Sequence, residues 1–459
     1  MRSRIFGSAR CGLLCWTVAL AALLTHAQWA AAQQNGGIEV DAAGVVRTQM
    51  LQDPSGRLTL ARQAAAMAKV NAGEVTGSSE LRKVSLTRLE KAIAAAIARG
   101  EKPDMMMEHL AGLTSIEYVF CLPDSGDVVI AGPAEPFFES SEKEMLGVES
   151  LKPVLLLQDL VAALRAYAPG AAPTTVLSVS IDPTAEGLAN LQAVLARVGG
   201  FATPRDTESL VATMRKALGD QTVTLKGVDP KTHFANIFVA ADYRMKLIGI
   251  GLVKPAAPIS TYVDNARGGS ANALVRWYFV PDYECVRVSD DRLAMQLVGG
   301  GVKLVGANEL VNAAGGRTAA GGADAASRKF TESFTRNYDA LAEKDSTYAQ
   351  LRNLVDMSIA AAYIQSQDFF GMTGWKMSTL GDEAAYPIET LNAAQKAGTA
   401  INAIWKGRTL MTPIGGGINV QPHQALRPEN LLQDADGQVK QMRNGLSVKE
   451  IPADQWWWD

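Results

Sequence analysis

The sequence has few cysteines and histidines, and this scarcity excludes several kinds of site. Only four cysteines occur in 459 residues, so a disulfide-dense scaffold is excluded. Three of the four histidines, His109, His233 and His423, follow the N-terminal region, and no two of them have the spacing of a zinc-binding pair. We therefore expect no metal site and no bound cofactor.

Long apolar runs and well-known catalytic motifs are also absent. After the N-terminal region, no stretch approaches the roughly 18 uncharged apolar residues that a membrane-spanning helix needs. The sequence has no Walker A loop, no nucleotide-binding glycine fingerprint, no CxxC, no HExxH and no GxSxG. These absences argue against stable membrane insertion of the mature chain and against the enzyme classes that the motifs mark.

The N-terminus is typical of an export signal. Arg2, Arg4 and Arg10 precede an apolar segment at residues 11–24, which is too short to span a bilayer comfortably. Alanines at positions 30 to 32 supply the small residues preferred before a cleavage site, so we place cleavage after Ala32. The mature protein is therefore expected in the periplasm or the extracellular space.

The charge balance of the mature chain is mildly acidic. Removal of the signal at residues 1–32 takes away three of the 44 basic residues, which leaves 41 against 47 acidic residues. A nucleic-acid-binding protein would be expected to carry a basic stripe. We therefore expect no nucleic-acid partner.

Two cysteines remain after the signal, and their pairing stays open. Cys121 and Cys285 have one possible pairing in an oxidising compartment. Both lie in apolar, strand-like surroundings, where a buried free thiol behaves as a small hydrophobe. Spacing alone cannot bring their Cα atoms within bridging distance.

Helical and strand-like periods alternate along the chain and predict an α+β fold. A hairpin is predicted over residues 115–131, and a strand–helix–helix–strand unit over residues 174–228. Asp182 is expected to cap the first helix of that unit. Thr87 and Glu90 are expected to form a capping box on an earlier helix.

The segment 232–254 is the densest apolar run of the chain and carries three charges. Residues 234–240 are predicted as a strand. For residues 241–249, alternation of charged and apolar side chains fits a strand, whereas the spacing of Asp242 and Lys246 fits a helix, which we favour. The block 274–306 that follows is predicted as a β-meander.

The overall prediction is an α+β fold of mixed sheet layers with packed helices and a β-meander, followed by a helix-rich C-terminal part. Composition divides the mature chain into several parts. The predicted parts are a flexible lead-in at 33–55, an α+β core of one or more domains at 56–311, a Gly/Ala-rich linker at 312–326, a helical and β region at 327–422, and a polar tail at 423–459 that ends in WWWD.

Carboxylates near the segment 232–254 are the candidates for catalysis. A pair of them could serve as acid and base; the candidates are Asp242, Asp282, Glu284, Asp290 and Asp291. Each also has a structural explanation, as a turn residue or, for Asp242, as part of an ion-pair network. Arg244 and His233 are candidate binding residues because they could line a polar pocket with Asp242.

The C-terminal Trp456, Trp457 and Trp458 suggest a second kind of site. Tryptophan dominates interface hot spots, so these residues could bind an envelope protein. Three exposed tryptophans would be a liability in an exported protein. Docking on the protein's own surface is therefore slightly favoured.

Several segments resemble an uncharacterised family of exported proteins from planctomycete bacteria, catalogued as a domain of unknown function. The resemblance is carried by EHLAGLTSIEYVF, DVVIAGPAE, SIDPTAEGL, THFANIFVAADYRMKLIGIGL, RWYFVPDYECVRVSDDRLAMQLVGGGVKLVG, YAQLRNLVDMSIAAAYIQ and GWKMSTLGDE through WKGRTLMTPIGGGINVQP. These segments run from about residue 108 to residue 422. The family has no established activity or catalytic set, so the resemblance implies an exported protein with one long architecture and assigns no functional residue.

Two functions follow as hypotheses. The first is a non-enzymatic binding or scaffolding protein of the cell envelope, which fits the absence of a catalytic motif. The alternative is a carboxylate-dependent hydrolase that acts on envelope polymers. The hydrolase requires two of the candidate carboxylates to lie within about 5–10 Å of each other in a concave pocket.

Overall fold

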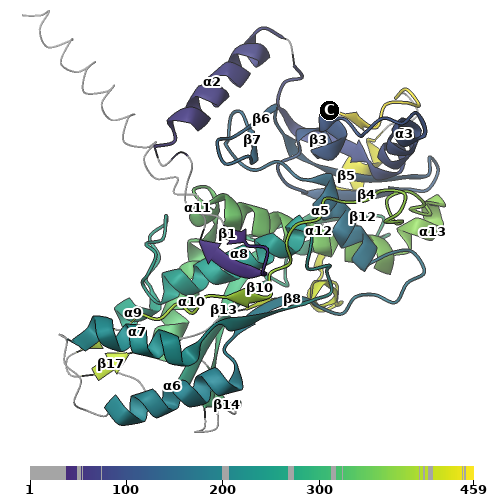
Figure 1. Ribbon diagram of the computed structural model, residues 1–459. Helices are drawn as coiled ribbons and strands as arrows, with labels where there is room; N and C mark the ends of the chain where they lie inside the picture. Colours follow the sequence, from purple (N-terminus) through teal and green to yellow (C-terminus); the bar gives the residue numbers. More distant parts are fainter. Residues whose placement is uncertain are drawn as a thin grey trace, which may run out of the picture.

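The computed structural model describes residues 38–48, 53, 55–73, 75–198, 206–266, 273–311, 317–322, 324–402, 404–406, 409–411, 417–446, 448 and 451–459. The predicted export signal lies outside these residues. The described chain forms two large sheets with a layer of helices between them, so the α+β prediction is confirmed (Figure 1).

The first sheet has seven strands and contains the predicted hairpin. Its order is β19 (Leu432–Gln433), β11 (Val286–Val288), β12 (Ala294–Leu297), β4 (Tyr118–Leu122), β5 (Asp127–Ala134), β3 (Ser79–Ser85) and β20 (Trp457–Trp458). β4 and β5 pair antiparallel as predicted. Successive residues of β4 face opposite sides: Val119 and Cys121 belong to the main core, whereas Phe120 packs in a smaller cluster with Val439.

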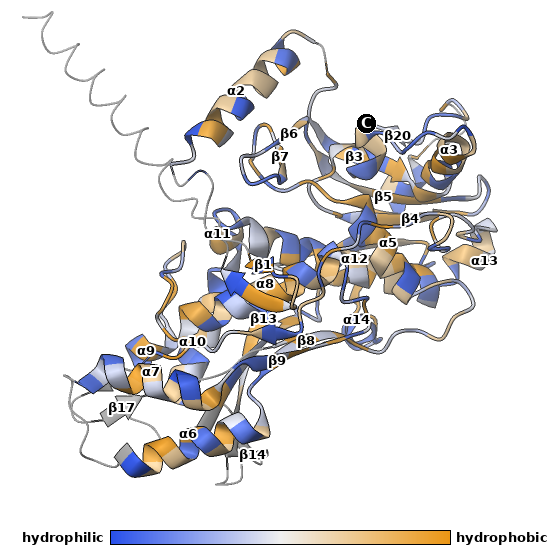
Figure 2. Ribbon diagram, viewed as in Figure 1, coloured by the Kyte–Doolittle hydropathy of each residue, from blue (hydrophilic) through white to orange (hydrophobic). Residues whose placement is uncertain are grey.

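The second sheet has nine strands. Its order is β1 (Ile38–Val40), β2 (Val45–Thr48), β15 (Lys396–Ala397), β9 (Gln221–Lys226), β8 (Leu177–Asp182), β18 (Ile418–Val420), β10 (Ala273–Pro281), β13 (Val302–Val311) and β14 (Arg317–Gly322). The predicted strand–helix–helix–strand unit is β8, α6 (Ala185–Val198), α7 (Thr207–Leu218) and β9. Apolar and polar residues alternate along α6 and α7, whose apolar sides pack in a small separate core (Figure 2).

The four strands predicted over residues 274–306 all form, but they do not make one meander. β10 pairs with β13 over nine residue pairs in the nine-stranded sheet. β11 and β12 pair with each other and join the seven-stranded sheet through β4. Alternating hydrophobicity identifies a strand without identifying its neighbour, which is why the connectivity was predicted wrongly.

The helix α8 (His233–Gly249) replaces the strand predicted over residues 234–240, and the helix favoured for 241–249 is its second half. Thr232 caps it, because its hydroxyl accepts a hydrogen bond from the Ala235 amide at 3.1 Å. Phe234, Val239 and Met245 are all fully buried, so the helix has apolar residues on most sides. A helix that is buried on most sides has no polar face, so its sequence lacks the periodic alternation of apolar and polar residues by which a helix is recognised.

Two predicted helix caps are also wrong. Ser85 caps α3 (Leu86–Ala98), while Glu90 is buried and accepts a hydrogen bond from the indole of Trp375 at 2.5 Å. Thr184 lies at the start of α6, where its hydroxyl accepts from the Gly187 amide at 3.0 Å. Asp182 ends β8 instead and pairs with a basic residue of β10.

The helical layer consists of α5 (Leu157–Ala166), α8 and α12 (Ser346–Ser366). α12 is buried along most of its length, as its apolar sequence predicts. No helix in the described ranges combines the length and apolar character needed to cross a bilayer.

The remaining α-helices of the described residues are α2 (Arg57–Asn71), α4 (Met105–Glu108), α9 (Tyr262–Asn265), α10 (Ala325–Arg336), α11 (Tyr338–Ala342), α13 (Phe369–Thr373), α14 (Pro422–Ala425) and α15 (Gln438–Asn444).

Part of the stretch predicted as a linker has regular structure. β14 lies within residues 312–326 and pairs with β13, and α10 begins at Ala325. Residues 312–316 and 323 lie outside the described residues. The predicted tail at 423–459 supplies β19, α15 and β20, two of which are strands of the seven-stranded sheet.

The two cysteines do not pair. Cys121 and Cys285 are free and buried, so no disulfide links them. Burial raises the pKa of each thiol to about 12. Both therefore stay protonated at neutral pH and serve as small apolar residues.

Candidate functional site

Of the five carboxylates singled out from the sequence, four lie outside α8 and the helical layer. Asp282 follows β10 and pairs with Lys303 at 2.6 Å. Asp290 and Asp291 lie in the β11–β12 turn, where Lys440 and Arg443 of α15 pair with them at 2.9 and 2.8 Å. These pairs attach α15 to the hairpin.

The five candidates are also not brought together in a cavity. Glu284 is exposed, whereas Asp242 is completely buried on α8. None of the five lines either of the two cavities beside α12 that are described below.

The charges of α8 form interior pairs. The Lys246 ammonium lies 3.6 Å from the Asp242 carboxylate and donates a hydrogen bond to the Ile181 carbonyl at 2.6 Å. Burial raises the pKa of Asp242 to about 6, and the nearby Lys246 opposes this shift. Arg244 pairs with Asp345, the N-cap residue of α12. The two pairs hold α8 against β8 and α12, so their arrangement is structural.

The C-terminal tryptophans pack on the protein's own sheet. β20 pairs antiparallel with β3, and Trp456 is buried. The guanidinium of Arg82 lies 4.6 Å from the ring centre of Trp457 and donates to Asp459 at 2.7 Å. The indoles therefore complete the edge of the seven-stranded sheet.

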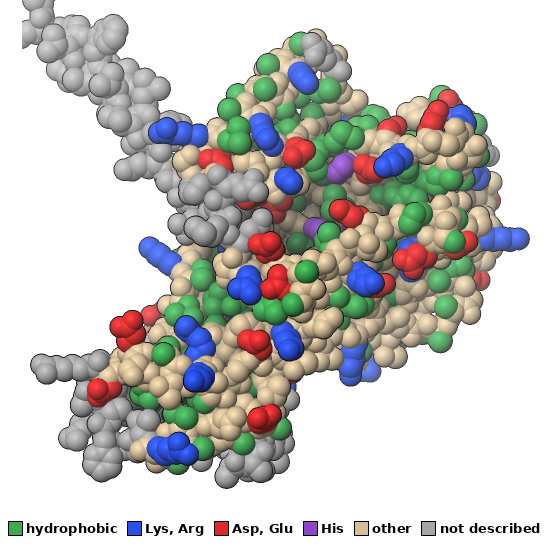
Figure 3. All heavy atoms as spheres, viewed as in Figure 1, with side chains coloured by type: hydrophobic (Ala, Val, Ile, Leu, Met, Phe, Trp, Pro, Cys, Tyr) green, Lys and Arg blue, Asp and Glu red, His purple; other side chains and the backbone are tan. Residues whose placement is uncertain are grey.

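His233 lies in a cavity of about 260 Å³, here called the His233 cavity. Its walls come from the end of α4, the hairpin of β6 (Phe137–Glu139) and β7 (Met145–Gly147), α5, the first turn of α8 and α12. Figure 3 shows a hollow on this face of the molecule with histidine side chains at its margin. The lining residues are His109, Lys143, Glu144, Met145, Pro153, Val154, Leu155, Leu156, Gln158, Asp159, His233, Gln350, Asn353, Leu354, Met357 and Glu389.

A histidine–carboxylate pair lies in the wall of this cavity. His233 Nδ1 is 2.9 Å from Asp159 Oδ2, and the two residues come from the first turns of α8 and α5. Burial lowers the pKa of His233, but the carboxylates of Asp159, Glu144 and Glu389 together raise it by more, so the net shift is upward. The contact orients the ring and leaves Nε2 as its other proton donor or acceptor.

Glu144 presents an unsatisfied carboxylate oxygen in the same cavity. Its Oε1 accepts hydrogen bonds from Ser346 at 2.7 Å and Gln350 at 3.1 Å. Its Oε2 is shielded from solvent and accepts none in the described structure. Burial raises the pKa of Glu144. A shielded acceptor without a donor is costly, so a ligand that donates to it would recover free energy.

The backbone beside Glu144 has an unusual conformation. Lys143 lies in the β6–β7 turn with φ of 64°, in the left-handed region that few non-glycine residues adopt. Backbone strain of this kind is common beside ligand sites.

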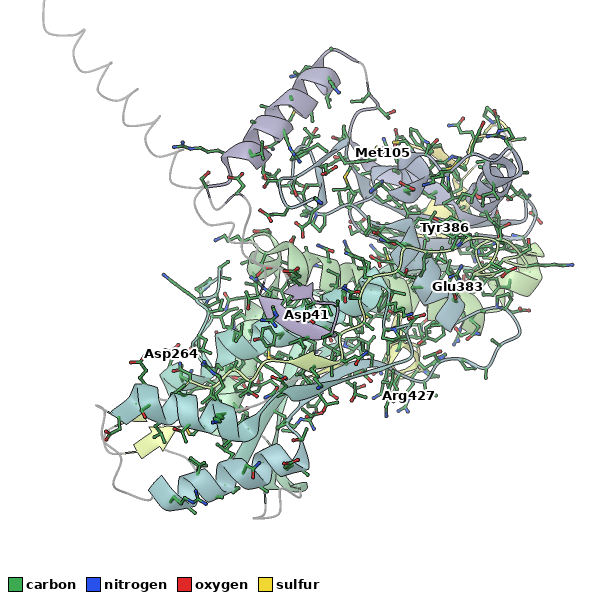
Figure 4. All side chains as sticks on the ribbon, viewed as in Figure 1. Asp41, Met105, Asp264, Glu383, Tyr386 and Arg427 are labelled. Atoms are coloured by element: carbon green, nitrogen blue, oxygen red, sulfur yellow. The ribbon has the colours of Figure 1, made fainter. Side chains whose placement is uncertain are left out.

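A long connection brings a third acid to the cavity. The segment 374–395 runs from α13 to β15 and carries Glu389 into the cavity wall. Arg165 of α5 anchors it by donating to the carbonyls of Leu380 at 2.9 Å and Tyr386 at 2.6 Å. Tyr386 and Glu383 of this segment are labelled in Figure 4.

The side chains of the His233 cavity suit binding better than covalent catalysis. No serine, threonine or cysteine is among its lining residues. Within the described parts of the chain, no group of three or more histidine, cysteine, aspartate or glutamate side chains is placed to hold a metal ion. The carboxylates and amides that line the His233 cavity can accept and donate hydrogen bonds, while Leu155, Leu354 and Met357 supply an apolar surface.

Sequence reasoning singled out one of the four titratable residues described above for the His233 cavity and missed the other three. His233 is the residue it identified. Glu144, Asp159 and Glu389 were not, because they lie 74 to 156 residues from His233 and carry no shared motif. Only the packing of α5, α8 and α12 brings them together.

Comparison with known proteins places a domain in the region that contains His233. The model of a family described as "Protein of unknown function (DUF1598)" matches residues 179–262. The matched segment runs from β8 to the start of α9, so it also includes the interior charges of α8. No curated protein and no solved structure matches the chain.

Proposed function

We propose that this chain is an exported protein of the cell envelope that binds a small, hydroxyl-rich ligand of monosaccharide size in the His233 cavity. The N-terminal basic and apolar segments support export. Binding to a partner through the tryptophan tail is the weaker part of the earlier hypothesis, because the indoles pack on β3 and Arg82.

The observation that carries this proposal is the unsatisfied Oε2 atom of Glu144 in the cavity. Together with Asp159 and Glu389, it offers acceptors for several hydroxyl groups. The apolar surface of Leu354 and Met357 is suited to the C–H face of a sugar ring. A volume of about 260 Å³ lies just below the roughly 300–1,000 Å³ of pockets for drug-sized ligands, so a single ring is the appropriate size.

Calorimetric titration with glucose, glucosamine and N-acetylglucosamine tests the proposal. At least one sugar should bind the full mature protein, and Glu144→Gln and His233→Gln should each weaken binding by roughly tenfold or more. His423→Gln is the matched control, because His423 packs against Tyr167 outside the cavity. Failure of all three sugars to bind, or unchanged affinity in both cavity variants, would contradict the proposal.

Hydrolysis of an envelope glycan is the second candidate, and the Asp159–His233 contact is the observation that favours it. A histidine held by a carboxylate can activate a water molecule through its other nitrogen. A hydrolase would release reducing ends from envelope glycan fragments, and Asp159→Asn would abolish this release. Absence of any release by the wild-type protein would leave binding as the function.

A further inference from the structure

A second cavity adjoins the His233 cavity on the other side of Asn353 and Pro153. It has a volume of about 590 Å³ and lies between the β12–β13 turn, α11 and α12. We call it the Asp356 cavity. Its charged lining residues are four acids and two bases: Glu117, Asp339, Glu343, Asp356, Lys152 and Arg352.

Asp356 is the unusual residue of this cavity. Its side chain is only 7% exposed, and it lines the cavity from α12. Arg352 Nε forms an i,i+4 ion pair with Asp356 Oδ2 at 3.8 Å, a distance too long for a hydrogen bond. The Arg352 guanidinium instead donates to Asp339 at 3.1 Å and to the Gly299 carbonyl at 2.8 Å. Asp356 therefore receives no hydrogen bond from the guanidinium beside it.

On the other side of Asp356, the backbone of Gly301 lies close to the carboxylate. Gly301 lies against the carboxylate with φ of 70°, and a Cβ atom there would be 3.4 Å from both Asp356 Oδ1 and Arg352 Nε. Burial raises the pKa of Asp356 to about 7, and Arg352 opposes this shift. A buried carboxylate without donors is unfavourable, and a cation that donates to it would remove much of the cost.

We propose that the Asp356 cavity binds a ligand that carries a protonated amine or guanidinium group, with the Asp356 carboxylate as the receptor for that group. The excess of acidic over basic side chains around the cavity favours a cation over an anion. This site is separate from the proposed sugar site, because neither His233 nor Glu144 lines it.

Calorimetric titration with putrescine and arginine methyl ester, with 1,4-butanediol as the neutral control, tests this site. At least one of the two cations should bind the wild-type protein more tightly than the diol does. Asp356→Asn should weaken that binding roughly ten- to hundredfold, the usual effect of losing a charge-assisted hydrogen bond. Glu332→Gln, which is exposed on α10 and does not line the cavity, is the matched control and should change the affinity by less than about threefold.

A second variant keeps the test decisive if Asp356→Asn folds poorly. Ala349→Trp should fill the cavity from α12, keep every charge and abolish cation binding. His233→Gln should leave cation binding unchanged, so the test stands apart from that of the sugar site. Equal affinity of diol and cations, or full cation affinity in both Asp356→Asn and Ala349→Trp, would overturn the proposal.

Discussion

Asp242 and Asp356 are chemically alike but differ in their surroundings. Each is a buried carboxylate on a central helix, with a basic residue one helical turn away: Lys246 for Asp242 and Arg352 for Asp356. Lys246 lies in the interior and points at Asp242 and at β8. Arg352 turns toward α11 and the β12–β13 turn, and Asp356 borders a cavity. An acid and a base four residues apart on a helix therefore hold the fold in one place and border a cavity in the other.

Removal of the Asp242 partner should have the largest effect. Lys246→Met leaves a buried carboxylate without its cation, which typically costs about 3–5 kcal/mol in free energy of unfolding. Urea denaturation measures the change. The double variant Asp242→Asn with Lys246→Met should recover much of the loss, because no charge is then buried. A loss below about 1 kcal/mol in Lys246→Met would contradict the structural role of this pair.

The pH dependence of stability should separate the two carboxylates. The pKa of Asp356 is raised to about 7 from an ordinary 3.8, so between these values the folded state holds a proton that the unfolded state releases. The free energy of unfolding should therefore fall as pH rises from about 4 to 7, by up to about 3–4 kcal/mol. Denaturation of Asp356→Asn should lack this fall. For Asp242 the corresponding fall should end near pH 6, the pKa to which burial raises it.

The contact between Asp159 and His233 should have a smaller and local effect. Asp159→Asn removes a carboxylate that raises the pKa of His233, so this pKa should fall. In the wild type, the raised pKa of His233 adds stability at low pH that is lost as pH rises through the folded-state value. NMR titration of the imidazole signals measures the shift. The pKa of His423, lowered by burial elsewhere, is the internal control and should stay unchanged.

The exposed pair of Asp290 and Lys440 should have the smallest effect. Asp290 lies at the β11–β12 turn with its side chain mostly in solvent. Solvent screening makes such pairs worth little, so Asp290→Asn should leave the melting temperature unchanged within error. A clear drop in melting temperature would show that this pair contributes as much as the buried ones.

Local patterns predicted most of the elements but failed where burial or long-range pairing decides. The β4–β5 hairpin and α12 follow from alternation and from a long apolar run. The first half of α8 was missed because a helix buried on most sides loses its polar face. The predicted meander does not form, because β11 and β12 pair with each other and not with β10 or β13, and β12 pairs with β4, which lies far away in sequence.

The candidate sites were less predictable than the fold. Asp356 has the sequence environment of an ordinary i,i+4 ion pair, and nothing local shows that Arg352 turns away from it. Glu144 and Asp159 come from a short hairpin and from the first turn of a helix, and they meet His233 only through packing. The charges of α8 attracted attention because they interrupt an apolar run, and that interruption marks an interior ion pair.

Methionine methyl NMR tests the central claim most directly, namely that the cavities beside α12 bind ligands while the interior of α8 holds the fold. Met145 and Met357 line the His233 cavity, whereas Met245 is buried in the interior on α8. Addition of the sugar that binds in calorimetry should shift the Met145 and Met357 methyl signals until saturation and leave Met245 in place. Unchanged Met145 and Met357 signals at saturation, or an equal shift of Met245, would contradict the claim.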